Sequence, residues 1–195
     1  MKLIFATQNR HKADEIRSVL SPGLEIITLQ EAGIFDDIPE PFDTLEANAS
    51  AKSRTIYEKT GQNCFSEDTG LEVMALHGEP GVKSARYAGD DRSPEANIEK
   101  LLSNLAGMTD RRARFRTVIS LLIDGRETLF EGSCEGRIIG EKRGFQGFGY
   151  DPVFIPDGSE ATFAEMGMPE KNRYSHRKKA VEKLVAFLNN LSVNH

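Results

Sequence analysis

The chain has 195 residues, 38% of them hydrophobic and 28% charged, with a formal net charge of −5 and a sequence pI of about 5.5. This composition is typical of a globular protein, and the length fits a single domain over residues 1–195 with room for two lobes. The acidic balance argues against a nucleic-acid-binding protein, whose surface is normally basic, and no apolar run approaches the ~20 residues of a membrane span.

The elements predicted in the first half of the chain alternate between strands and helices. In chain order we expect a strand at 2–6, a helix at 12–20, a strand at 24–29, a helix from 43 to about 60, and strands at 63–66 and 71–76. Asp43 and Glu46 resemble a capping box for the second helix, and Gly61 is a natural stop for it. The opening strand, loop, helix and strand are typical of an α/β fold.

The second half is predicted to contain a long hairpin. We expect a helix from 93 to about 105, strands at 113–123 and 127–139, a short strand at 152–155 and a final helix from 175. Ser93 and Pro94 suit the N-cap and first position of a helix, and Asp124-Gly125 is a strong hairpin turn. An antiparallel hairpin in a chain of strand–helix units predicts a mixed sheet.

A polar loop separates the first predicted strand from its helix. It consists of Thr7, Gln8, Asn9, Arg10, His11 and Lys12. Backbone N–H groups and the positive dipole end at a helix N-terminus attract anions, and Asn9 and Lys12 can add donors for phosphate. Taken alone, a solvated polar turn explains this loop better. The loop lacks a Walker A pattern, so it does not predict a P-loop ATPase.

An acidic turn is predicted at Ser66-Glu67-Asp68-Thr69-Gly70, where a strand ends. Active sites of α/β folds gather at strand ends, and adjacent carboxylates suit Mg²⁺. Solvated acidic turns are also very common. Helix capping already explains Asp43 and Glu46, so Glu40 is the better candidate for a second metal ligand.

A glycine- and aromatic-rich loop occupies residues 144–151. Phe148 and Tyr150 can stack on a nucleobase, and Asp151 can accept from a ring N–H. A turn with two core aromatics is an equally good interpretation.

The segment 171–179 carries five cations and no acid. His176 and Arg177 stand where the last helix begins, and Arg177 can offer paired donors to a base edge or a phosphate. Cations in a first turn oppose the helix dipole. We therefore expect an anionic neighbour there, either a ligand or an acidic surface.

The two cysteines, Cys64 and Cys134, are far apart and match no zinc-binding or disulfide pattern. We expect both to be small core residues. A reducing compartment fits them, so the sequence favours a cytoplasmic location.

Taken together, the motifs resemble the inosine triphosphate pyrophosphatases, also called noncanonical purine NTP pyrophosphatases. The resemblance runs nearly end to end and rests on these matches: Ala6 to Asn9 with Lys12, Asn48-Ala49 with Lys52, Ser66 to Leu71, Pro80-Gly81 with Ser84 to Tyr87, Phe148 to Pro152, Glu170-Lys171, and Ser175 to Arg177. Each motif alone is weak, but their order and spacing together are specific.

The resemblance implies a long curved mixed β-sheet flanked by helices, with two lobes and a central cleft. It implies hydrolysis of ITP, dITP and XTP to the monophosphate and pyrophosphate, with Mg²⁺ as cofactor and a homodimer as the usual assembly. The alternative is a related pyrophosphatase of the Maf type that acts on modified pyrimidine nucleotides. A nucleotide sensor without turnover is a third hypothesis.

The resemblance also assigns roles to residues. Asp68 is implied as the general base and a metal ligand, and Glu40 as the second ligand. The residues implied to hold the phosphates are Thr7, Gln8, Asn9, Arg10, His11, Lys12 and Thr69. Those implied for the base pocket are Phe148, Gly149, Tyr150, Asp151, Lys171, His176 and Arg177. Two positions depart from the family: Gln8 replaces the usual Gly, and Thr69 replaces the Ser of many bacterial members.

Overall fold

The computed structural model describes residues 1–20 and 22–193. Its strands are β1 (Lys2–Phe5), β2 (Glu25–Thr28), β3 (Cys64–Val73), β4 (Pro80–Gly81), β5 (Arg112–Ile123), β6 (Arg126–Ile138) and β7 (Phe154–Pro156). Its α-helices are α1 (Arg10–Arg17), α2 (Leu45–Thr60), α3 (Pro94–Asn104), α4 (Met168–Lys171) and α5 (His176–Val193). Residues 194 and 195, which end the predicted domain, lie outside the described residues.

The strands form a mixed sheet, as predicted. Its seven strands follow the hydrogen-bonded order β2-β1-β3-β5-β6-β7, with β4 paired to β3. The β1–β2 and β1–β3 pairs are parallel, whereas β3–β4 and β6–β7 are antiparallel. The predicted Asp-Gly turn joins β5 to β6: φ is 48° at Asp124 and 76° at Gly125, as a two-residue hairpin turn requires.

The chain divides into two compact units. Unit 1 contains residues 1–68, residues 117–132 and the chain from 177 onward, and unit 2 contains residues 69–116 and 133–176. The chain therefore passes between the units inside β3, inside β5, inside β6 and at the start of α5. Whether the whole is one domain, as the sequence predicts, stays a prediction.

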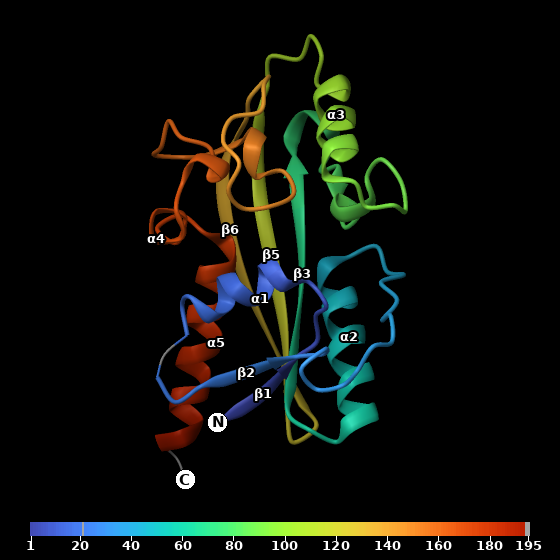
Figure 1. Cartoon of the computed structure of the whole chain (residues 1–195), viewed down its shortest axis with the longest axis vertical. Helices are drawn as coiled ribbons and strands as arrows, with labels where there is room; N and C mark the ends of the chain where they lie inside the picture. The colour runs from blue at the N-terminus through green and yellow to red at the C-terminus, as the bar shows by residue number, and fades with distance from the viewer. Residues whose placement is uncertain (21, 194–195) are drawn as a thin grey trace. The chain divides into compact units, whose positions relative to one another are not determined.

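Unit 1 carries helices on both faces of its strands (Figure 1). Leu3 and Phe5 of β1 join a core with Ile16 of α1 and Leu184 of α5. Alternate side chains, such as Ile4, join a second core with α2. Because successive side chains of a strand point to opposite faces, a strand covered on both sides is apolar throughout. This arrangement explains the unbroken apolar run of β1.

Unit 2 has a core of its own, rich in aromatic side chains. Phe115 of β5 meets Phe154 of β7 edge-on, with ring centroids 4.7 Å apart, and lies 6.0 Å from Phe163. Leu101 of α3 is buried in the same cluster. Among the described residues, no helix is long and apolar enough to cross a membrane.

The predicted acidic turn at residues 66–70 is wrong, because β3 runs straight through it. The two short strands expected at 63–66 and 71–76 are one strand. Gly70 serves close packing here: a Cβ atom on it would lie 2.6 Å from the carbonyl oxygen of Gly81, in the strand paired to β3. Gly70, which suggested a turn in the sequence, is instead required by the close approach of two backbones.

Side-chain oxygens cap the N-termini of α2 and α3, but the residue predicted to cap α2 is wrong. Thr44, not Asp43, caps α2, because its Oγ1 accepts from the N–H of Ala47 at 3.1 Å. The capping box predicted from Asp43 and Glu46 is therefore wrong by one position. Gly61 ends α2 with a φ of 65°, and Ser93 caps α3, both as predicted.

Candidate functional site

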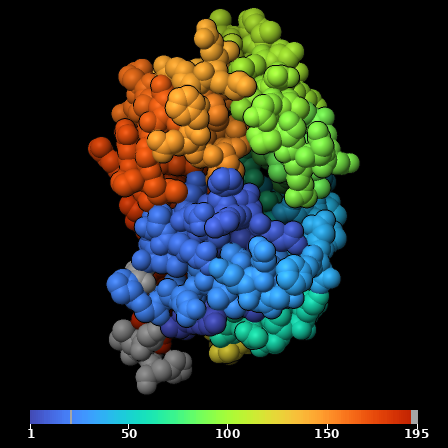
Figure 2. Space-filling view, viewed as in Figure 1, coloured from blue at the N-terminus to red at the C-terminus, as the bar shows by residue number. Residues whose placement is uncertain are grey.

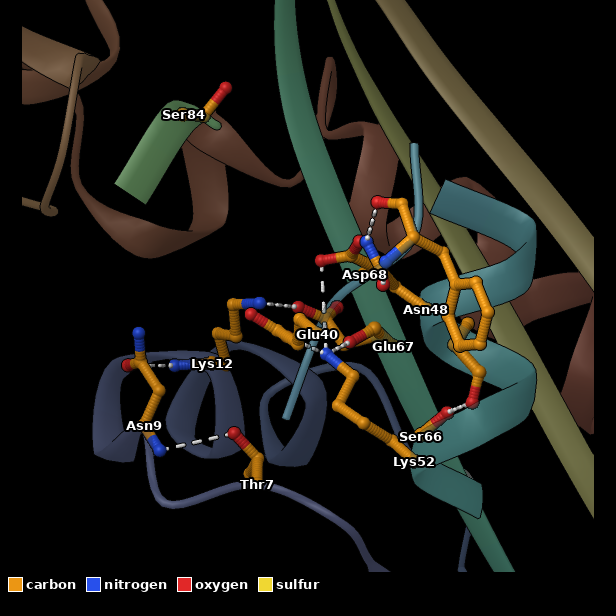
Figure 3. Close-up of polar contacts among 12 residues, drawn as sticks. Thr7, Asn9, Lys12, Glu40, Asn48, Lys52, Ser66, Glu67, Asp68 and Ser84 are labelled. Atoms are coloured by element: carbon orange, nitrogen blue, oxygen red, sulfur yellow. Dashed lines mark hydrogen bonds and ion pairs between the residues drawn. The ribbon is translucent and has the colours of Figure 1, made fainter. Parts of the chain in front are cut away.

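Two carboxylates share one lysine ammonium in unit 1 (Figure 3). The Nζ of Lys52, on α2, pairs with Glu40 and lies 3.7 Å from Oδ1 of Asp68. It also donates to the carbonyl oxygen of Glu67 at 2.7 Å. The predicted metal ligands Glu40 and Asp68 therefore lie close together, and the ammonium of Lys52 lies between them.

The carboxyl group of Asp68 has a raised pKa. Burial raises this pKa, the charges of Lys52 and Lys12 lower it, and the charge of Glu40 raises it again. A hydrogen bond with Asn48 favours the ionised form. A carboxylate with a raised pKa is a stronger base, and a group of this kind can take a proton from water.

Asn48 of α2 anchors the segment that leads from Glu40 into the helix. Its Nδ2 donates to the carbonyl oxygen of Phe42, and its Oδ1 accepts from the N–H of Phe42, both at 3.0 Å. One buried amide thus satisfies both backbone groups of a residue two positions after Glu40. The placement of Glu40 depends on α2 as well as on its own loop.

A buried ion-pair network lies behind Asp68 in unit 1. Arg177 of α5 binds Glu67 through two bonds, Nε to Oε2 at 2.7 Å and Nη2 to Oε1 at 3.0 Å. Its Nη1 pairs with Glu15 of α1, and Lys12 lies 2.9 Å from Oε1 of Glu67. Burial alone would raise the pKa of Glu67, but attraction to Arg177 and Lys12 outweighs it and holds the pKa well below its usual range.

This network supplies the anionic neighbours that the cations at the start of α5 were expected to need. Arg177 is only 2% exposed, and its donors point at two carboxylates of the protein. Buried guanidinium groups require such partners, since an unpaired buried charge is very costly. Its expected role in reading a base stays a prediction.

The loop before α1 is ordered by its own side chains. The N–H of Asn9 donates to Oγ1 of Thr7 at 3.0 Å, and Oδ1 of Asn9 accepts from the N–H of Lys12 at 3.2 Å. Asn9 is therefore the N-cap of α1, which starts at Arg10, two residues earlier than predicted. Arg10 and His11 are exposed in the first turn.

Gln8 replaces the usual glycine without backbone strain. Its φ is not positive, so this loop conformation does not require glycine. The Nε2 of Gln8 donates to the carbonyl oxygens of Asp36 at 3.0 Å and Phe35 at 3.4 Å.

The expected base-pocket residues of unit 2 also come together. Lys171 pairs with Oδ2 of Asp151 at 2.6 Å, and the same oxygen accepts from the N–H of Phe148 at 3.1 Å. Lys171 Nζ lies 5.4 Å from the ring centroid of Phe148. His176 stacks on Phe115 with ring centroids 4.8 Å apart.

Tyr150 follows the alternative interpretation of this motif. It is buried in the unit 2 core, and its hydroxyl donates to the carbonyl oxygen of Ser84 at 2.7 Å. Gly147 and Gly149 have φ values of 74° and 59°, and a Cβ atom on Gly147 would lie 2.0 Å from Oδ2 of Asp151. The glycines therefore allow a tight turn around Asp151, in which Phe148 is half-buried.

The predicted residues fall into one group within each unit. Unit 1 holds residues 7–12, Glu40, Asp68 and Arg177, and unit 2 holds Thr69, residues 148–151, Lys171 and His176. Thr69, expected to touch phosphate, follows Asp68 directly in β3.

Sequence reasoning assigned no role to Lys52 or Glu15, although both complete the unit 1 cluster. Glu15 follows Lys12 by three positions on α1, a spacing that places both on one helix face. Lys52 likewise follows Asn48 by four positions on α2. The sequence signal that could have identified Lys52 and Glu15 was a charged residue on the face of a helix that is otherwise buried.

Three comparisons relate the chain to known proteins. The model of the Ham1 family matches residues 3–187. A dITP/XTP pyrophosphatase of Christiangramia forsetii is 50% identical over 96% of this chain and 99% of that protein. One of Porphyromonas gingivalis is 52% identical over 96% of this chain and 97% of that protein.

Solved structures agree in fold. The Ham1 protein of Staphylococcus aureus has a TM-score of 0.88 at 39% identity, covering 97% of this chain and 99% of its own. The nucleoside-triphosphatase, or dITP/XTP pyrophosphatase, of Mycobacterium abscessus has a TM-score of 0.77 at 37% identity, covering 95% and 99%. The α/β fold predicted from the sequence is thus confirmed.

Proposed function

The chain belongs to the Ham1 family, and from this membership we propose that it hydrolyses noncanonical purine nucleoside triphosphates. It is a nucleoside triphosphate pyrophosphatase that converts ITP, dITP and XTP to the monophosphate and pyrophosphate. The observation that carries the proposal beyond the family is the pairing of half-buried Glu40 and buried Asp68 around Lys52. The Maf-type alternative is not favoured, because the relatives are named dITP/XTP pyrophosphatases.

In the proposed reaction, water attacks the α-phosphorus. Asp68 accepts a proton from that water, the bond from the α-phosphorus to the bridging oxygen breaks, and pyrophosphate leaves with that oxygen. A carboxylate held mostly inside the protein suits this task, since burial raises its pKa and with it its basicity.

The phosphate chain is proposed to lie at the N-terminus of α1. This helix offers backbone N–H groups at its first turn, and Lys12 adds a positive charge. Oε1 of Glu67 lies 2.9 Å from that ammonium and fixes the position of Lys12. Thr7, Gln8, Asn9, Arg10, His11 and Thr69 are proposed as further phosphate-binding residues.

Magnesium is the proposed cofactor, with Glu40 and Asp68 as its ligands. The donors fit, because Mg²⁺ in nucleotide sites usually binds one or two carboxylates together with phosphate oxygens and water. No group of three or more metal-ligating side chains occurs in the part of the chain that is described, so the substrate phosphates and water would have to supply the remaining ligands. When bound, the ion would neutralise charge on the triphosphate.

Base recognition is proposed for unit 2 and the start of α5. Phe148 would stack on the base, and Gly149, Tyr150, Asp151, Lys171, His176 and Arg177 would shape or line its pocket. Hypoxanthine and xanthine carry an oxo group at position 6, where adenine has an amino group. A site with donors for that oxygen can reject adenine by about 10⁴–10⁵-fold.

Two further expectations accompany the proposal. We expect a homodimer from the family resemblance, and a cytoplasmic location because the two cysteines match no disulfide pattern. Size-exclusion chromatography with light scattering measures the first.

The deciding experiment incubates the purified chain and Mg²⁺ with ITP, dITP, XTP, ATP, GTP and pyrimidine nucleotides. We expect the monophosphate and pyrophosphate from the first three nucleotides and little from ATP. Release of a diphosphate and orthophosphate would reject the proposed chemistry. Preference for modified pyrimidines would restore the Maf-type reading, and tight ITP binding without turnover would indicate a sensor.

A further inference from the structure

The loop between β2 and α2 carries Glu40 and is fastened to unit 1 at its two ends. At the near end, Arg17 Nη2 binds both carboxylate oxygens of Glu31, at 2.7 and 2.8 Å, and Ile34 is buried in the core. At the far end, Asn48 binds both backbone groups of Phe42. The loop lies at the molecular surface (light blue in Figure 2).

The middle of this loop has one apolar contact with the core, since Ile38 is half-buried against the second core of unit 1. Phe35 is 73% exposed, and Asp36 and Asp37 are exposed as well. Residues 35–41 adopt no helix or strand. Segments with few buried apolar contacts open easily, so the exposed part of this stretch, residues 35–37, depends on polar contacts for its position.

Gln8 supplies such contacts from the neighbouring loop. Its Nε2 donates to the carbonyl oxygens of Phe35 and Asp36, 27 and 28 residues further along the chain. Lys59 of α2 adds an ion pair to the Asp36 side chain. The side-chain amide thus ties the loop before α1, where phosphate is proposed to bind, to the loop that carries Glu40.

We propose that Gln8 is a positioning residue that fastens residues 35–42 and so holds Glu40 beside Lys52 and Asp68. Glycine at position 8 has no side chain with which to make this tie, so the tie is specific to chains with a donor there. The inference rests on the proposed function only for its catalytic consequence. The tie itself consists of hydrogen bonds within unit 1.

Two substitutions isolate the donor. Gln8→Met keeps the length of the side chain but removes the N–H groups. Gln8→Glu keeps the shape but places carboxylate oxygens against two carbonyl oxygens, which repel them. Gln8→Lys retains a donor and should restore the tie. Gln30→Met, at an exposed glutamine in the same loop, is the matched control.

The first measurement is hydrogen exchange of the amides of residues 35–42 without nucleotide. We expect Gln8→Met and Gln8→Glu to speed this exchange on the order of 2- to 10-fold, as loss of one or two exposed hydrogen bonds implies. Amides of α3, in unit 2, should be unchanged in every variant. Unchanged exchange in residues 35–42 would overturn the proposal.

The second measurement is ITP hydrolysis at varied Mg²⁺. We expect Gln8→Met to raise the Mg²⁺ concentration for half-maximal rate by a similar factor, with Gln30→Met near the parent value. A raised KM for ITP with unchanged exchange would mean that the Gln8 amide acts only through nucleotide binding and does not hold the loop, which would overturn the proposal. If the parent chain hydrolyses no ITP, the proposed function fails, and the exchange data alone decide the tie.

Discussion

Asp68 combines burial with a shared cation, and its carboxyl oxygens are the chemically important atoms of unit 1. Asp68→Asn keeps the side-chain volume and the neighbours Lys52 and Asn48 but removes the basic oxygen. We expect turnover of ITP to fall by about 10²–10⁴-fold, while ITP binding, measured by calorimetry, stays within a few fold.

Asp110→Asn is the control for this variant. Asp110 is a carboxylate of unit 2 bound to Arg112 at the surface, so its loss should leave the rate unchanged. Near-normal turnover by Asp68→Asn would show that another group takes the proton.

Arg177 is a stability determinant because it neutralises two buried carboxylates. Arg177→Ala would leave Glu15 and Glu67 in the protein interior without their main partner. Breaking a buried pair in this way costs about 3–5 kcal/mol, which urea unfolding at pH 7 measures. Arg177→Lys should fall between, since lysine keeps the charge but loses the two parallel bonds to Glu67.

A triple variant tests the cause of that loss. Replacing Glu15 and Glu67 with glutamine in an Arg177→Met background removes all three charges, and it should recover part of the stability. A cost below about 1 kcal/mol for Arg177→Ala would show that water reaches these carboxylates. Purine selectivity should be compared only where each variant is folded.

At the scale of elements, α1 begins at a residue that caps the helix and is also proposed to bind phosphate, Asn9. Asn9→Ala removes the cap of α1 and should lower the free energy of unfolding by about 0.5–2 kcal/mol. Ser93→Ala removes the equivalent cap of α3, where Oγ accepts from the N–H of Ala96 at 3.2 Å, and should cost a similar amount. Only Asn9→Ala should also raise KM for ITP, because only α1 starts at the proposed phosphate site.

Steady-state kinetics beside thermal unfolding separates the two effects. Equal KM values in both variants would place the phosphates away from α1.

The helices and strands show which parts of this fold can be predicted from the sequence. The Asp124-Gly125 hairpin and the Ser93-Pro94 helix start were predicted correctly, because the signal lies in adjacent residues. The turn predicted at residues 66–70 was wrong, because Gly70 is required by the approach of β4, a contact between strands. Local sequence does not reveal pairing of that kind.

The candidate site divides in the same way. Asp68 and Glu40 were predicted and do lie around one ammonium, but Lys52 was given no role, since its partners are 12 to 16 positions away. For Tyr150 the sequence allowed either stacking on a base or packing in the core. In the structure its buried hydroxyl donates to the carbonyl oxygen of Ser84, which is distant in sequence. Candidate site residues can be predicted from the sequence, whereas the residues that they contact depend on the tertiary fold.

At the scale of the whole molecule, each unit has its own core, yet three strands contain residues of both. Unfolding of one unit would therefore break the hydrogen bonds of strands that continue into the other. We expect a single cooperative transition in calorimetry, and the same transition should move when either core is weakened.

Ile16→Ala in unit 1 and Leu101→Ala in unit 2 test this expectation. Both side chains are fully buried, so each change should cost about 2–5 kcal/mol and lower Tm by ~2–4 °C per kcal/mol. Two transitions, each sensitive to one substitution only, would show that the units unfold independently.

The buried pair between Arg177 and Glu67 joins residues 110 positions apart, and Arg177 follows Glu15 by 162 positions. On the ribosome, at ~5–20 residues per second, Arg177 is added roughly 5–20 s after Glu67. During that interval the nascent chain holds two acidic side chains whose arginine has not yet been made. The carboxylate next to the proposed catalytic base thus gains its principal partner only once Arg177 has been added, so unit 1 can reach its final electrostatic state only after synthesis has reached α5.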